Sequence, residues 1–538
     1  QTPTLAMIIA RENEIRKFVP KDYWTISAGF CGFNATWQDG KSKQTRIFDK
    51  AKAEAIVTKV SGRAGTIVEV KKEAKRELPP LAYDLTELQR DANRKYGYSA
   101  KKTLSLMQRL YEFHKLVTYP RTDSRYITDD IVPTLPERLK AIAIGPYLKG
   151  ANTILRSKLN VTRRLVDNSK VSDHHAIIPT EQYVDLSALN NDERHIYDLI
   201  VKRFLAVLSP AFEYEQTTVR IEAADEIFTA GGRIIGAPGW KGIYDGESSA
   251  DDEDDEYEEE YNCAHQSLPP VARGQKGPMA AVRSVNGKTK PPKRFTEATL
   301  LSAMEHPGKY MDNKALREVI EEASGLGTPA TRADIIEKLF DNFYMERQGK
   351  EIVPTSKGIQ LIDLVPSDLK QPELTAKWEQ QLTLISTGRT DPKAFIAKMR
   401  DYAASLVGTV ISDSHVYKHD NVTRERCERC GKFLLEVNGK RGKMLICPDR
   451  ECGFRKNIST VSNARCPECH KKMELRGEGD DRSFFCTCGY REKLSAFKKR
   501  KGESVSKREV NQFLRTQHTD TNINSALADA LAKLKNPD

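Results

Sequence analysis

Apolar residues recur at helical spacing near the start of the chain and again in its middle. At the start, five of them stand among charged residues: Leu5, Ile8, Ile9, Ile15 and Phe18. The spacing predicts helices over residues 1–19, 84–96, 99–115 and 188–208. Gly97 separates the middle pair, and Ser99 suits an N-cap. After a junction at Lys288–Pro292, helices are expected to dominate as far as about residue 406.

Alternating β-branched and polar residues predict two blocks of strands, 24–70 and 217–290. The first block includes Ile56–Val60 as a strand. If the blocks pair, the helical segment 80–205 becomes an insertion that projects from a β-rich arch. The acidic run 250–260 is too charged to pack and is expected to form a loop tip.

The length of 538 residues predicts three or four domains. Residues 411–538 contain 27 Lys and Arg against 18 Asp and Glu, so they carry +9 of the net charge of +11. This favours a polyanionic partner, although a solvated basic surface explains it equally well. The chain has neither an apolar run of about 18 residues nor a secretion signal, so we expect a cytoplasmic protein without membrane contact.

Tyr119-Pro120-Arg121 is the candidate for covalent chemistry. Pro120 disfavours helix at Tyr119, so the phenol should stand on an extended turn. Arg121 can point the same way and stabilise a phenolate or a pentavalent phosphate. Attack on a phosphodiester would store the bond as a phosphotyrosine ester, which reseals without ATP. The plain alternative is a tyrosine packed at a helix end beside a surface arginine.

The segment Tyr119–Ser124 resembles the active-site signature of type IA topoisomerases, in the bacterial topoisomerase III branch. Seven more stretches resemble the same family in the same order: 1–5, 79–89, 97–104, 172–180, 290–298, 325–332 and 374–379. Together these matches span about residues 1–410. Tyrosine recombinases and relaxases are disfavoured, since the chain lacks their additional Arg, His or metal-binding residues.

The resemblance implies roles for the matched positions. Tyr119 would be the nucleophile that takes the 5′ phosphate, Arg121 would contact the scissile phosphate, and His174 would help to position it. Asp123 and Ser124 fit a capped turn better than catalysis. DNA contacts are implied for Arg121 and for four further residues: Gln1, Thr328, Thr331 and Arg332. A structural histidine and a glycine turn before a capped helix remain the plain alternatives for His174 and for segment 325–332.

The fold implied is a multidomain α+β torus with a helical active-site domain, a β-rich arch and a helical base. The expected bounds are as follows: base with a single-strand groove, 1–22 and 291–410; arch, 23–78 and 206–290; tyrosine-bearing helical domain, 79–205; zinc ribbons, 424–460 and 463–494; basic tail, 495–538.

The implied activity is ATP-independent cleavage of one DNA strand, strand passage and religation, which relaxes negative supercoils and decatenates. The chain contains no G-x-x-x-x-G-K-[ST] phosphate loop. Family members bind Mg²⁺ in an N-terminal Toprim domain. The chain opens where that domain has ended, so we expect a fragment that is inactive alone. A monomer acting on single-stranded DNA, with a helicase or single-strand-binding protein as partner, is expected. A non-catalytic single-strand-binding protein is the alternative.

Eight of the ten cysteines lie between residues 427 and 488, in pairs typical of metal ligands. Two Cys₄ zinc ribbons are predicted from the sets Cys427, Cys430, Cys447, Cys452 and Cys466, Cys469, Cys486, Cys488. His470 is a weaker alternative ligand, and Cys31 and Cys263 are expected to be free thiols. The ribbons could be plain spacers. A mixture of basic and aromatic residues instead favours contact with single strands: Arg455, Lys456, Phe484, Phe485, Tyr490 and Arg491.

Overall fold

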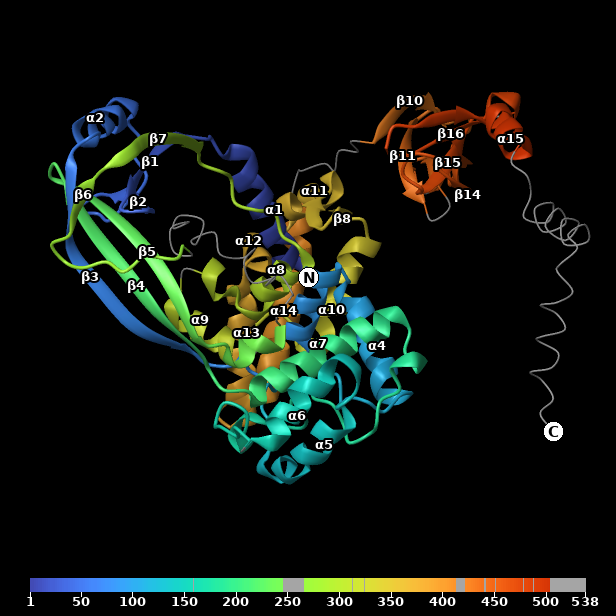
Figure 1. The fold of residues 1–538 in the computed structure, drawn as a ribbon. Coiled ribbons are helices and arrows are strands. Elements are labelled where there is room, and N and C mark those ends of the chain that lie inside the picture. Colours follow the sequence, from blue (N-terminus) through green and yellow to red (C-terminus); the bar gives the residue numbers. More distant parts are fainter. Residues whose placement is uncertain are drawn as a thin grey trace, which may run out of the picture. The chain divides into compact units, whose positions relative to one another are not determined.

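The computed structural model describes residues 1–157, 159–244, 266–311, 313–323, 325–412, 421–439, 442–449, 451–477, 479–486 and 488–503. It divides into two compact units, Gln1–Val416 and Tyr417–Asp538 (Figure 1). The predictions for the acidic run 250–260, for Cys263 and for the tail beyond 503 fall outside the described residues. No helix among the described residues is long and apolar enough to cross a membrane.

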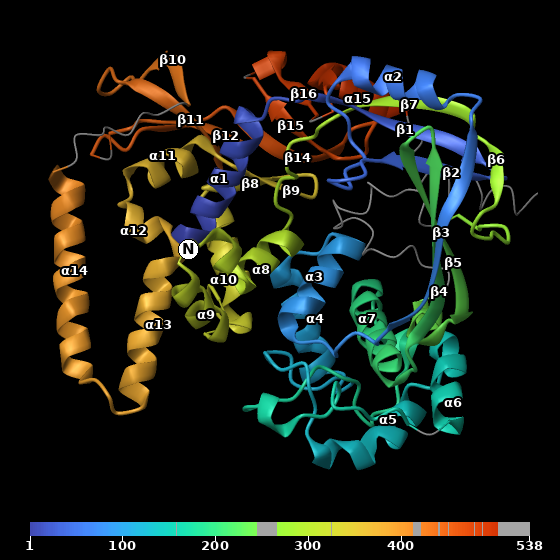
Figure 2. The same ribbon diagram turned by 90° about the vertical axis from the view of Figure 1, so that its left-hand side faces the viewer.

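A seven-stranded antiparallel sheet joins the two predicted strand blocks. Its order is β6-β3-β4-β5-β2-β1-β7. The strands are β1 Asp22–Phe30, β2 Phe33–Gln38, β3 Ala64–Glu77, β4 Phe212–Ala223, β5 Glu226–Ala237, β6 Lys276–Pro278 and β7 Ala280–Lys288. β3 pairs with β4 from Thr66↔Glu222 to Glu77↔Phe212, although about 140 residues separate them in sequence. The predicted pairing of the blocks is therefore confirmed, and the helical segment between β3 and β4 is an insertion (Figure 2).

One part of the first block is a helix rather than the predicted strand. α2 spans Lys50–Val60. Its N-cap residue is Asp49, whose side chain accepts hydrogen bonds from two backbone N–H groups. Ala53, Ile56 and Val60 are buried and pack on one face of the sheet. The cap and this three- and four-residue spacing outweigh the β-propensity of Ile56–Val60, because burial of one helical face decides the conformation.

The inserted helices form their own core. They are α3 Leu85–Tyr96, α4 Ala100–Glu112, α5 Leu135–Ala141, α6 Leu148–Arg156 and α7 Asn191–Leu208. As predicted, Gly97 separates α3 from α4 and Ser99 caps α4. Gly97 has the left-handed conformation. α7 begins with a capping box between Asn190 and Glu193. Figure 2 shows this layer at the end of β3–β5 opposite α2, so the long strands connect it to the far end of the sheet.

The first helix packs with the helices that follow the sheet. α1 Thr2–Lys17 buries Leu5 and Ile8 in one core with residues from 295–376. The later elements are α8 Glu297–Glu305, α9 Lys314–Glu322, α10 Pro329–Asp341, β8 Met345–Gln348, β9 Glu351–Pro354, α11 Ser356–Leu364, α12 Ser367–Lys370, α13 Pro372–Ser386 and α14 Pro392–Ser412. Arg294 pairs with the buried Glu12 at 2.9 Å, which fixes α1 to the start of this layer.

The second unit contains two four-stranded sheets, each built around one cysteine set. The first has β10 Val422–Arg426, β11 Phe433–Gly439, β12 Gly442–Ile446 and β13 Arg455–Asn457. The second has β14 Ser459–Arg465, β15 Lys472–Arg476, β16 Ser483–Phe485 and β17 Arg491–Lys493. The predicted basic tail from 495 begins with a helix, because α15 spans Leu494–Glu503. The Phe497 ring packs 4.6 Å from that of Phe484 and ties this helix to the second sheet.

Candidate active site and metal-binding centres

A short backbone ladder holds the tyrosine segment against residues 174–180. The N–H of Thr118 donates to the carbonyl of Ile178 at 3.0 Å, and the Thr118 hydroxyl donates to Ala176 O at 2.9 Å. The Thr122 hydroxyl donates to His174 O at 2.8 Å. The segment is extended before Pro120, as predicted. The helix α4 already ends at Glu112, however, so the proline is not what terminates it. The ladder therefore fixes the backbone on both sides of Tyr119.

Tyr119 and His174 lie together, 55 residues apart in sequence. Their rings stack with centroids 4.0 Å apart and planes at 29°. Both residues line a cavity of about 240 Å³. The other lining residues are Thr128, Val171, Ser172, Asp173 and His175. A phenol and an imidazole thus meet at an opening large enough for a phosphate group.

Arg121 lies near this site in sequence but is not held in it. The residue is exposed, and among the described residues no hydrogen bond or ion pair fixes its guanidinium or joins it to Tyr119. The neighbouring Ser124 has a structural role, since its hydroxyl accepts from the N–H of Tyr126 at 3.2 Å and donates to Lys170 O at 2.8 Å. Asp123 is exposed.

The other predicted DNA contacts divide into exposed and buried groups. Gln1 is exposed at the N-cap of α1. Thr328 and Thr331 are exposed and form the capping box of α10, in which the Thr328 N–H donates to the Thr331 hydroxyl at 3.0 Å. Arg332 contradicts its prediction: only 1% of it is accessible, and its guanidinium donates to the Thr86 hydroxyl at 2.7 Å. Because that side chain is inside the protein, it links α10 to α3 instead of meeting DNA.

The start of α3 connects this linkage to the tyrosine segment. The Leu85 N–H donates to Thr122 O at 3.1 Å, and Arg125 lies 4.0 Å from the carboxylate of Asp84. Asp84 caps α3 through the Glu87 N–H at 2.7 Å. Burial raises the pKa of Asp84 to about 7, against the opposing effects of that cap bond and of Arg125.

This raised pKa predicts a pH-dependent stability. An unfolded aspartate has a pKa of about 3.9, so the folded protein holds the proton more tightly than the unfolded chain does. The contribution of this proton to the free energy of unfolding is therefore lost as pH rises from about 4 towards 7. Asp84→Asn keeps a capping oxygen and cannot ionise. Relative to wild type, its free energy of unfolding should therefore gain on the order of 2 kcal/mol between pH 5 and pH 8. Denaturant unfolding at both pH values measures this.

Asp49→Asn is the matched control, since Asp49 is an exposed N-cap. This substitution removes a carboxylate that stays in contact with solvent in the folded protein, so it should not reproduce the pH response of Asp84→Asn. An equal pH response in the two variants would show that Asp84 is ionised in the folded protein throughout this range.

The two cysteine sets are brought together as predicted. In each set the four sulfurs lie within 4.8 Å of one another, and these are the only such groups found among the described residues. Neighbouring Sγ atoms are 3.6 and 3.3 Å apart in the first set and 3.6 and 3.2 Å apart in the second. These distances are far above a disulfide bond and close to the edge of ~3.8 Å of a zinc–thiolate tetrahedron. The donor sets fit zinc, and His470 stands outside the second one.

Comparison with known proteins establishes the family. The sequence model described as DNA topoisomerase matches residues 1–397 of the chain. The chain belongs to the DNA topoisomerase family. It is 51% identical to DNA topoisomerase 3 of Bacillus licheniformis over 99% of the chain and 73% of that protein. It is 50% identical to DNA topoisomerase 3 of Bacillus subtilis, with the same coverage.

A solved structure supports the fold. Full-length topoisomerase I from Thermotoga maritima matches with a TM-score of 0.58 and 24% identity, over 86% of this chain and 71% of that one. The expected type IA topoisomerase fold, with mixed helices and sheets and two possible zinc centres, is confirmed. The chain is accordingly an enzyme of the isomerase class, and DNA is its substrate.

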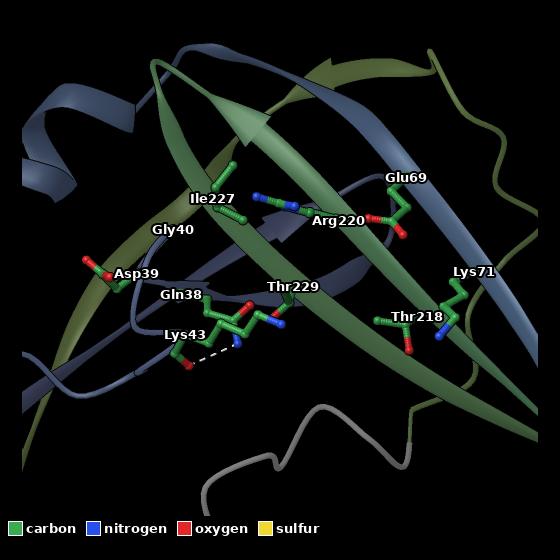
Figure 3. A pocket seen from close by; sticks show the side chains of 10 residues that line it. All are labelled: Gln38, Asp39, Gly40, Lys43, Glu69, Lys71, Thr218, Arg220, Ile227 and Thr229. Atoms are coloured by element: carbon green, nitrogen blue, oxygen red, sulfur yellow. Dashed lines mark hydrogen bonds between the residues drawn. The ribbon is translucent and has the colours of Figure 1, made fainter.

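A larger depression in this topoisomerase lies on the seven-stranded sheet, away from Tyr119. It has a volume of about 340 Å³ and is lined by residues of β2–β5 and of the turn after β2 (Figure 3). Its cations Lys43, Lys71 and Arg220 are accompanied by the carboxylates of Asp39 and Glu69. These charges nearly cancel and the lining contains no tyrosine, serine, cysteine or histidine, so we place the candidate active site at the smaller cavity.

The aromatic residues around the second cysteine set differ in accessibility. Phe484 is buried in the core of its sheet, which contradicts the prediction that it stacks on bases. Phe485 is partly exposed, with Arg476 and Arg491 at 4.9 and 5.3 Å from its ring centre. Arg455 and Lys456 of the first centre are exposed. A smaller basic and aromatic surface therefore remains than the sequence predicts.

Proposed function

We propose that this topoisomerase cuts one DNA strand through Tyr119, passes another strand through the break and reseals it. The observation that carries the proposal is the Tyr119–His174 stack at the 240 Å³ cavity. In that arrangement a phenol oxygen that could act as nucleophile and an imidazole that could donate a hydrogen bond to a phosphate line the same cavity. The predicted partner Arg121 is exposed beside it and free to turn towards a bound phosphate.

The chemistry conserves the phosphodiester bond energy. The Tyr119 oxygen attacks the phosphorus, the bond from phosphorus to the 3′ oxygen breaks, and the 5′ phosphate becomes a tyrosine ester. The phenol gives up its proton, and the leaving 3′ oxygen takes one up. Attack by that 3′ hydroxyl reverses the step, so no ATP is needed. Arg121 and His174 would stabilise the negative charge that develops on the phosphoryl oxygens.

Further parts of the proposal follow from the family resemblance. The domain bounds expected from the sequence are proposed as functional units, with Gln1, Thr328 and Thr331 along a single-strand path. Mg²⁺ would hold the cleaved ends for religation, and zinc would be structural. We also propose a monomer that acts at the bacterial nucleoid, with a helicase or single-strand-binding protein as partner, and zinc ribbons that contact single strands through Phe485 and its arginines.

Covalent capture tests the proposed function. Single-stranded oligonucleotides labelled at either the 5′ or the 3′ end are incubated with the natural full-length protein, and the reaction is stopped with detergent. The label on the 3′ side of the cut, which carries the new 5′ phosphate, should migrate with protein. Capture of the opposite fragment would overturn the polarity, and capture of neither would leave a DNA-binding protein.

We propose in addition that residues 1–538 alone do not relax supercoiled DNA. The reason is that the resemblance assigns Mg²⁺ to a domain outside the matched segments. Relaxation assays on this polypeptide, with and without Mg²⁺, test the statement. Robust relaxation would contradict it.

A further inference from the structure

A third aromatic ring completes the surroundings of Tyr119. Tyr111 lies in the last turn of α4, and its ring is perpendicular to that of Tyr119 with centroids 5.6 Å apart. His174 stacks on Tyr119 at 4.0 Å. The Tyr119 ring is thus contacted by one ring in a stacked arrangement and by another at a right angle. Perpendicular aromatic pairs at such distances are a favoured geometry.

Tyr111 is itself held in place. The Lys115 ammonium lies 5.7 Å from the centre of the Tyr111 ring, within the range of a cation–π contact. Lys115 has a φ of 58°, which turns the chain between α4 and the tyrosine segment. Its carbonyl accepts a hydrogen bond from the Thr180 hydroxyl at 2.6 Å. The turn that positions Lys115 over Tyr111 is therefore anchored to the same ladder that holds Tyr119.

The backbone ladder alone leaves the orientation of the phenol open. It fixes the main chain around Tyr119, but rotation about the side-chain bonds would still swing the phenol oxygen through several ångströms. In-line attack on phosphorus requires that oxygen within about 3–3.5 Å of its target and correctly aligned. His174 restricts the ring by one face only, and it is exposed. A second contact is needed to define the ring plane.

We infer that Tyr111 is a positioning residue that sets the orientation of the Tyr119 ring for attack. The inference rests on the proposed function of Tyr119 and adds a residue that does not touch the reacting atoms. Packing of the ring carries the effect, so the Tyr111 hydroxyl is dispensable. Tyr111→Phe should preserve cleavage, while Tyr111→Leu should slow it.

Two measurements test the inference. The first is single-turnover cleavage of a labelled oligonucleotide by the natural full-length protein, which gives the rate of adduct formation. Fluorescence anisotropy gives the Kd for the same DNA. Tyr111→Leu should slow adduct formation by ~10- to 100-fold with Kd unchanged. Tyr111→Phe should stay within about twofold of wild type. Tyr183→Leu is the control, since Tyr183 is a surface tyrosine with 68% of it exposed.

The second measurement does not need activity. NMR of residues 1–538 with ring-labelled tyrosine, assigned with Tyr119→Phe, reports the flipping of the Tyr119 ring. In wild type it should flip more slowly than the Tyr183 ring, and Tyr111→Leu should speed it. Fast flipping of the Tyr119 ring in wild type would overturn the inference, and this result does not depend on whether the leucine variant folds. Unimpaired cleavage by Tyr111→Leu would also overturn it. So would a cleavage defect in Tyr111→Phe equal to that in Tyr111→Leu. Slow flipping without any covalent adduct in wild type would support the role of Tyr111 and reject the proposed function.

Discussion

Tyr119→Phe will abolish covalent capture of DNA, with the adduct falling by at least ~10³-fold. The phenylalanine ring keeps the contacts with His174 and Tyr111 and removes only the oxygen that we propose attacks phosphorus. DNA affinity should therefore be unchanged, which separates loss of chemistry from loss of binding. The measurement is the fraction of labelled oligonucleotide that migrates with protein after detergent, beside Kd from anisotropy.

Tyr126→Phe is the matched control for this variant. Tyr126 lies seven residues further along, and its hydroxyl accepts a hydrogen bond from the Lys170 ammonium at 3.2 Å. Losing that partly exposed bond should leave adduct formation near the wild-type level. Capture by Tyr119→Phe at more than a few per cent of the wild-type level would show that another residue is the nucleophile. An equal loss in both variants would point to disruption of the segment as a whole.

Local signals in the sequence predict most of the elements. The pair α3 and α4 is bounded by Asp84, Gly97 and Ser99, each of which acts on backbone groups only a few residues away. The pairing of β3 with β4 could be anticipated from the two strand blocks. The helix α2 could not, because its β-branched residues also suit a strand and the decisive event is packing of Ile56 and Val60 on a sheet formed partly by residues beyond 210.

The candidate site was predictable where family motifs carry it and uncertain where burial decides. The resemblance singles out Tyr119 and His174, and the structure places them in contact. The same resemblance suggested Arg332 for DNA, yet its charge is enclosed between α10 and α3. Tyr111 was missed because nothing in a helical pattern distinguishes a tyrosine that contacts Tyr119 from one that fills a core. Only the path of the chain after α4 brings the two rings together.

The two cysteine sets are the opposite case, since the members of each set are close in sequence. Each set consists of two pairs of cysteines, and the members of a pair are only a few residues apart. The spacing alone therefore predicts which sulfurs meet. The surrounding hydrophobic cores are small, and half of the buried residues of the first are cysteines: Cys427, Leu434, Leu445 and Cys447. Such a core is too small to hold a sheet together without its metal.

Removal of zinc will therefore unfold residues 421–503 and leave residues 1–412 folded. Structural zinc in small domains contributes on the order of 10 kcal/mol to folding, which exceeds what either small core supplies. A strong chelator should abolish hydrogen-exchange protection in β11, β12, β15 and β16, while protection in the seven-stranded sheet and α7 is retained. Metal analysis before treatment should give about two zinc ions per chain, as the two Cys₄ sets require.

Single substitutions separate the two centres. Cys447→Ser should lower the zinc content to about one ion and remove protection from β11 and β12 only, because the second set keeps its four thiolates. The control is Cys31→Ser, since Cys31 is a partly buried thiol outside both sets. Retained protection in the chelated protein would mean that the ribbons fold without metal. Loss of both ions in Cys447→Ser would mean instead that the two centres bind zinc cooperatively, through contacts such as the hydrogen bond from the Lys443 N–H to the Ser459 hydroxyl at 2.7 Å.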